Sequence, residues 1–142
     1  MDLKAVFSQS EKTRSITERL TQNELSHIHL KGLVGSAVSF YAGGLYTNFP
    51  TNQVFILNDK EEAAYFYNDM QRIIGEDKVL FFPSSYRRPY QIEETDNANI
   101  LSRAEVLNAL TKRSSTRCVV TYPDALSELS LIHISEPTRH AS

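Results

Sequence analysis

The stretch VFILNDKEEAAYFYNDMQRIIGEDKVLFF, residues 54–82, decides the fold class of this chain. It opens with the apolar run VFILN, residues 54–58, which is typical of a strand covered on both faces. Asp59 and Glu62 follow with the spacing of a helix capping box. Apolar side chains then recur at helical spacing until Gly75, which stands where a helix C-cap is expected. The stretch therefore predicts a strand followed by an amphipathic helix.

The same alternation of elements continues toward the C-terminus. The apolar run at residues 78–82 predicts a second strand, which Pro83 ends. Ser102 with Glu105 predicts the cap of a further helix. The run RCVVTY, residues 117–122, predicts another strand, and PDALSE begins a helix with proline in its first turn. Because strands alternate with helices, we expect an α/β fold with a mostly parallel sheet and flanking helices.

Three more elements are predicted on the N-terminal side of the deciding stretch. Residues 8–25 are polar with Ile16 and Leu20 at helical spacing, which indicates an amphipathic helix. The alternating segment SHIHLKGL, residues 26–33, predicts a strand. The segment AVSFYAGGLY, residues 37–46, predicts a short helix that its two adjacent glycines weaken. The predicted sheet thus has four strands.

The composition is that of an ordinary globular protein. The chain has 142 residues, of which 41% are hydrophobic and 23% charged, enough for one domain with its own core. The net charge of -2 means that a nucleic-acid role would need a local basic patch. Cys118 is the single cysteine, which excludes an internal disulfide framework. Since no apolar stretch approaches the length of a membrane span, we expect a cytoplasmic protein with no membrane partner.

The turn between the predicted strand at residues 26–33 and the predicted helix at residues 37–46 has the frame of a phosphate-binding loop. Such a loop follows the pattern G-x-x-x-x-G-K-[ST], and the positions that correspond to it are Gly32, Gly35, Ser36, Ala37, Val38 and Ser39. Ala37 replaces the second glycine and Val38 replaces the lysine, so no cation would neutralise bound phosphates. We interpret the motif as a degenerate loop whose glycines serve a turn. A coincidental turn and a working nucleotide site remain the alternatives.

A second candidate site is the loop SSYRRPY, whose aromatic and cationic side chains are Tyr86, Arg87, Arg88 and Tyr90. Such side chains can contact a phosphate backbone or stack on a base. The acidic run EETD follows directly, so a solvated loop or a contact with a neighbouring domain is the favoured interpretation. His27 and His29 lack the partners of a metal site, and Cys118 is expected to pack as a small hydrophobic residue. We predict no catalytic residue and no metal site.

The last segment, LSLIHISEPTRHAS at residues 129–142, differs from the rest of the chain. Its first residues resemble the translation of a sequencing-library adapter, and such a scar is left out of fold reasoning. We therefore expect an N-terminal helical segment at residues 1–26, an α/β module at residues 27–128 and a non-native tail. On this interpretation the native continuation after Glu128 is missing and the sheet is incomplete.

Four motifs resemble the N-terminal module of the bacterial transcription-repair coupling factor, which is itself similar to the first domain of the B component of the excinuclease. They are HLKGLVGSAVSF, FFPSSYRRPY, NILSRAEVLNAL and CVVTYPDAL, and the resemblance spans His29 to Glu128. The order and spacing of the Gly-Ser-Ala turn and the Pro-Tyr loop make the combination specific. The chain departs from the family at Ser85 and Tyr86, where a Trp-Glu pair is common.

The resemblance implies a degenerate P-loop, helicase-like module that does not hydrolyse ATP and needs no cofactor. In the full-length family, ATP and Mg²⁺ bind elsewhere, in motor domains that translocate on DNA and push against stalled RNA polymerase. The implied partners are other domains of the same protein and, through them, RNA polymerase, damaged DNA and the A component of the excinuclease, which is its damage-recognition ATPase. A small nucleotide- or phosphate-binding α/β protein that uses the Gly35–Ser36 amides is one alternative. A fragment of the excinuclease B component itself is another, against which Val38 argues.

Overall fold

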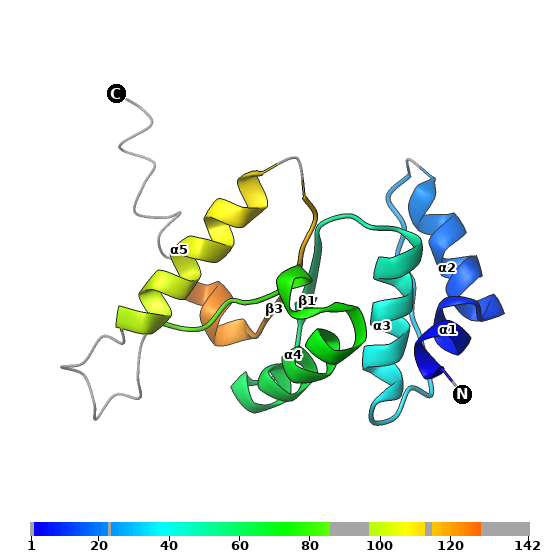
Figure 1. Cartoon of the computed structure of the whole chain (residues 1–142), viewed down its shortest axis with the longest axis horizontal. Helices are drawn as coiled ribbons and strands as arrows, with labels where there is room; N and C mark the ends of the chain where they lie inside the picture. Colours follow the sequence, from blue (N-terminus) through cyan, green and yellow to red (C-terminus); the bar gives the residue numbers. More distant parts are fainter. Residues whose placement is uncertain (1, 23, 86–96, 113–114, 129–142) are drawn as a thin grey trace.

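The structure, a computed structural model, describes residues 2–22, 24–85, 97–112 and 115–128. Within these residues, three parallel strands form one small sheet with helices around it (Figure 1). The strands are β1 (Gln53–Ile56), β2 (Val79–Phe81) and β3 (Cys118–Thr121), and their order in the sheet is β1-β3-β2. The expectation of a mixed α/β fold with a parallel sheet and flanking helices is therefore confirmed.

The helices lie on both sides of this sheet. They are α1 (Leu3–Ser8), α2 (Glu11–Thr21), α3 (Ala37–Asn48), α4 (Lys60–Ile74) and α5 (Asn97–Thr111), with a short 3-10 helix η1 (Glu76–Lys78) before β2. Helix α4 packs on β2 and β3, while α3 packs on α4 and is itself covered by α1 and α2. Helix α5 packs on β2, across the sheet from α3 (Figure 1). A last helical turn at residues 123–128 follows β3 as predicted.

The deciding stretch folds largely as predicted. The Asp59 carboxylate accepts the Glu62 N–H at 2.8 Å and so caps α4. Gly75 ends this helix with a φ of 106°, a conformation that favours glycine. The buried stripe of α4 consists of Ala63, Phe66, Met70 and Ile74. These side chains face the sheet because they recur at helical spacing.

Strand β3 is the centre of the core. All four of its residues are buried, and it pairs with β1 on one side and with β2 on the other. Val119 lies opposite both Val54 and Leu80 in the ladder. A strand that is paired on both sides and covered on both faces has a continuous apolar sequence. The sequence pattern predicts β3 well for this reason.

Strand β1 departs from the prediction that it is covered on both faces. The Phe55 ring packs against Phe66 of α4, with ring centroids 5.2 Å apart. Val54 and Ile56 point to the other face and are 55% and 59% exposed. That prediction is wrong because α5 contacts the sheet through β2, which leaves this face of β1 open.

The predicted strand at residues 26–33 does not form. This segment pairs with no strand among the described residues, and Ile28 is 37% exposed. Alternation of apolar and polar side chains can favour an extended backbone, but a strand also needs a neighbour to accept its hydrogen bonds. The described sheet accordingly has three strands where four were expected.

Two helix predictions also need correction. The helix expected at residues 8–25 forms as the shorter α2, which begins after its N-cap Ser10, whose Oγ accepts the Thr13 N–H at 3.2 Å; the preceding helix α1 was not predicted. Ser102 does not cap α5, which begins at Asn97, so the Ser102–Glu105 pattern lies inside the helix. The loop residues 86–96 and the tail 129–142 lie outside the described residues.

Candidate functional site

The glycine turn that resembles a phosphate-binding loop is built from two left-handed glycines. Gly32 and Gly35 have φ values of 81° and 59°, which other residues rarely adopt. The Ala37 N–H donates to the Val34 carbonyl at 3.2 Å and closes the turn before α3. Ser36 stands at the N-cap of α3, but its side chain makes no capping hydrogen bond. Glycine conformation therefore shapes this turn.

The two side chains at the chemical positions of the motif point to different surroundings. Val38, at the lysine position, is partly exposed and carries no charge. Ser39, at the position of the magnesium-binding hydroxyl, is 3% exposed, and its Oγ donates to Asp69 of α4 at 3.1 Å. The hydroxyl thus joins α3 to α4, and the loop has no side chain that would neutralise a phosphate.

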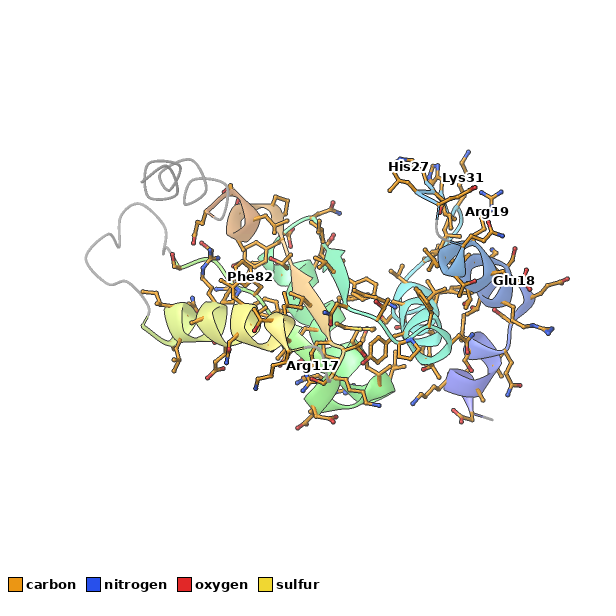
Figure 2. The ribbon with its side chains drawn as sticks, turned by 90° about the horizontal axis from the view of Figure 1, so that it is seen from above. Glu18, Arg19, His27, Lys31, Phe82 and Arg117 are labelled. Atoms are coloured by element: carbon orange, nitrogen blue, oxygen red, sulfur yellow. The ribbon has the colours of Figure 1, made fainter. Side chains whose placement is uncertain are left out.

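A second polar cluster lies at the carboxyl ends of β2 and β3, where ligands bind in many α/β proteins. Its centre is Arg103, a buried residue of α5. Arg103 Nη1 donates to the carbonyls of Pro83 at 2.8 Å and Ala125 at 3.2 Å. The guanidinium also lies 4.2 Å from the centre of the Phe82 ring, which Figure 2 shows beside α5. One side chain thereby joins α5 to the segments that follow β2 and β3.

Glu128 completes this cluster as its only carboxylate within the described residues. It lies 3.4 Å from Arg103 and accepts hydrogen bonds from the Ser84 hydroxyl, the Ser85 N–H at 3.0 Å and the Ser85 hydroxyl at 2.7 Å. Burial alone would raise the pKa of Glu128, but these hydrogen bonds and the Arg103 charge together hold it below its ordinary value. We call these groups, Arg103, Glu128, Ser84 and Ser85, the Arg103–Glu128 cluster.

Two further side chains fix the loop that leaves β2. The Ser84 N–H donates to the Tyr122 hydroxyl at 2.8 Å, and Asn99 Nδ2 donates to the Ser84 carbonyl at 3.1 Å. Burial raises the pKa of Tyr122, so the phenol stays neutral. The residues that begin the Tyr86–Tyr90 loop are therefore held by hydrogen bonds from two elements, while the loop itself lies outside the described residues.

The arrangement of the cluster is that of an anchor. No fully buried side-chain nitrogen or oxygen of the described residues lacks a hydrogen-bond partner, and Arg103 Nη1 and both Glu128 carboxylate oxygens form hydrogen bonds within the protein. The sequence interpretation missed both residues. The available signal was a charged side chain on the inner face of α5, since Arg103 lies one turn before the buried Val106.

The two candidate sites are separate. The glycine turn begins α3 and the Arg103–Glu128 cluster holds α5, and these helices lie on opposite sides of the sheet (Figure 1). Cys118 lies in neither site, and burial raises its pKa to about 12. Within the described part of the chain, no three metal-ligating side chains come together and no helix has both the length and the apolarity to cross a membrane.

Comparison with protein-family models, with curated proteins and with solved structures found no match to this chain.

Proposed function

We propose that this chain is a non-catalytic scaffold and interaction module, with a degenerate helicase-like fold, of an ATP-dependent DNA translocase that couples transcription to nucleotide excision repair. The proposal combines the sequence resemblance with one observation about the fold. Three of the four resembling motifs meet in the Arg103–Glu128 cluster, through Pro83, Arg103 and Ala125. Motifs that are far apart in sequence and in contact in space are expected when they maintain one structural unit.

The glycine turn supports the non-catalytic part of this proposal. Phosphoryl transfer in P-loop enzymes depends on a lysine and on a hydroxyl that holds Mg²⁺. Val38 offers no charge, and the Ser39 hydroxyl donates to Asp69 in the interior between α3 and α4. The turn then has a structural role, which is to reverse the chain before α3.

The Arg103–Glu128 cluster supports the interaction part. It fixes Ser84 and Ser85, from which the loop with Tyr86, Arg87, Arg88 and Tyr90 departs. Binding residues are often carried on loops that a rigid scaffold positions. We therefore assign this loop as the contact to other domains of the same full-length protein, and through them to RNA polymerase, damaged DNA and the damage-recognition ATPase of the excinuclease.

A chimeric protein tests the proposal directly. Residues 27–128 of this chain would replace the matching segment of a transcription-repair coupling factor. We expect the chimera to keep its DNA-dependent ATPase activity and its release of stalled RNA polymerase. A chimera with Arg103→Ala should lose part of that release while retaining ATPase activity. A chimera that folds but cannot act on stalled polymerase would contradict the proposal.

The alternative is a small protein that binds a nucleotide through the Gly35–Ser36 amides at the start of α3. A nucleotide titration of the chain, with and without Mg²⁺, separates the two functions. We expect no Mg²⁺-dependent binding of ATP or GTP. Specific Mg²⁺-dependent binding that Gly35→Val abolishes would favour the alternative.

A further inference from the structure

A basic hollow lies at the opposite end of the sheet from the Arg103–Glu128 cluster. It has a volume of about 460 Å³, within the range of small-molecule sites. Lys78 and Arg117 border it and directly precede β2 and β3, so the hollow lies at the amino ends of these parallel strands. Lys4 of α1 contributes from a third segment. In Figure 2, Arg117 and Phe82 mark the two ends of the sheet.

The charge of this hollow is not balanced by its surroundings. Lys4, Lys78 and Arg117 supply three cations, whereas Asp77 is the one carboxylate on its wall among the described residues. Within the same residues, none of the three cations has a salt-bridge partner. This concentration of positive charge occurs on a chain whose net charge is -2. An anionic ligand in the hollow would be attracted by all three charges.

The floor of the hollow is fixed before any ligand binds. The Tyr46 hydroxyl donates to the Thr116 carbonyl at 2.9 Å, and the Arg117 N–H donates to Asn52 Oδ1 at 3.0 Å. Arg117 uses Nη1 to donate to the Thr116 carbonyl at 3.1 Å, which leaves other guanidinium N–H groups for a ligand. A floor that is already ordered reduces the entropic cost of binding.

We propose that this hollow binds a phosphate group, held by Lys4, Lys78 and Arg117. Lysine acts on phosphate as a point charge and arginine as a planar donor pair, so the set suits a multiply charged phosphate better than a carboxylate. The phosphate is supplied either by a small anion such as pyrophosphate or by a nucleic-acid backbone. This site goes beyond the proposed scaffold function and shares no residue with the glycine turn.

The test is an NMR titration of the full chain in which amide chemical shifts report binding. One titration uses pyrophosphate and the other a short single-stranded oligodeoxynucleotide. We expect shifts that centre on Lys78 and Thr116–Cys118, with an affinity that falls as salt is added. The double change Lys78→Ala with Arg117→Gln should weaken binding by at least about tenfold, since it removes two charge-assisted contacts. Lys60→Ala removes an exposed lysine on α4 and is the matched control.

The outcomes distinguish a small anion from a nucleic-acid backbone as the source of the phosphate, and they distinguish the phosphate site from the scaffold function. Saturation by pyrophosphate alone identifies a small anion, and saturation by both ligands identifies a backbone phosphate. Lys4→Ala, on a helix away from the sheet, gives the same test if the double variant does not fold. Absence of saturable shifts, or equal weakening in Lys60→Ala, overturns the proposal. Any binding of ATP here would be lost in Lys78→Ala and kept in Gly35→Val, so it leaves the scaffold function untouched.

Discussion

At the scale of single residues, Glu128 links the loop after β2 to the helix that carries Arg103. Its carboxylate accepts hydrogen bonds from the Ser84 hydroxyl and from the N–H and hydroxyl groups of Ser85, and it lies beside the buried Arg103 guanidinium. Removal of one member of a buried charged pair leaves the other without compensation. We expect Glu128→Gln to lower the free energy of unfolding at pH 7 by roughly 1–3 kcal/mol. Urea unfolding measures this, with the exposed Glu105→Gln as a control that should change little.

The pH dependence of stability follows from the same carboxylate. The pKa of Glu128 is lowered in the folded chain, so the folded state binds this proton more weakly than the unfolded state does. The resulting stability is fully present above the ordinary pKa of 4.5 and is lost as the pH falls through the lower folded value. The free energy of unfolding, measured with urea from pH 7 into this acid range, should fall less steeply with pH in Glu128→Gln than in the unchanged chain. An identical slope in both proteins would contradict this assignment.

Cys118 gives a second prediction at this scale. Burial raises its pKa to about 12, and the thiolate is the reactive form of cysteine. We expect the native chain to react with iodoacetamide at pH 8 much more slowly than the urea-unfolded chain does. The adduct, measured by mass spectrometry, should appear only as fast as β3 becomes exposed. Rapid labelling of the native chain would show that this strand opens readily.

At the scale of elements, the glycines of α3 permit close packing of helices. A Cβ at Gly43 would lie 2.5 Å from Ile73 Cγ2 of α4, and one at Gly44 would lie 3.1 Å from the Ser8 backbone of α1. The glycines that weaken α3 in isolation are therefore required by its neighbours. Their role is invisible in local helix propensity because it depends on which helices α3 meets.

This packing predicts the effect of Gly43→Ala. Overpacking costs about 1–3 kcal/mol, while alanine gains about 1 kcal/mol of helix propensity over glycine. We expect a net loss of about 1 kcal/mol in the free energy of unfolding. In an Ile73→Ala background the clash disappears, so the same change should be neutral or stabilising. A double-mutant cycle by urea unfolding measures this coupling.

The sequence was informative wherever the signal was local. The caps Asp59 and Gly75 and the apolar stripe between them identify α4, and continuous apolar runs identify β1, β2 and β3. The segment at residues 26–33 was predicted wrongly because pairing depends on a neighbouring strand. Of the candidate site, the glycine turn was predictable from its residues. The Arg103–Glu128 cluster was not, because its hydrogen bonds join side chains of elements that meet only in the folded chain.

At the scale of the whole molecule, the described sheet has an open edge at β1. The Gln53 and Leu57 N–H groups donate to Arg117 and Thr121 at 3.1 and 2.9 Å, on the β3 side. Since backbone groups alternate sides along a strand, those of Val54 and Ile56 face away from β3. These are also the two residues of β1 whose side chains are more than half exposed. Such an edge favours association with another strand.

We therefore expect the isolated chain to self-associate as its concentration rises. Lysine on an edge strand opposes such pairing. Val54→Lys with Ile56→Lys should shift the chain toward monomer, and size-exclusion chromatography with light scattering measures the shift. Val34→Lys, at an exposed valine of the glycine turn, is the matched control. A chain that stays monomeric at all concentrations would show that this edge is protected.

The strand order β1-β3-β2 also affects how the chain is made. β1 and β2 do not touch each other, and the strand that joins them is the last of the three to leave the ribosome. At synthesis rates of about 5–20 residues per second, several seconds separate the synthesis of β1 from that of Thr121 at the end of β3. During that time α4 can form, but its apolar side chains and those of β1 cannot yet pack against β3. The sheet therefore cannot close until Thr121 has been made, and until then the nascent chain leaves apolar side chains of β1, β2 and α4 uncovered.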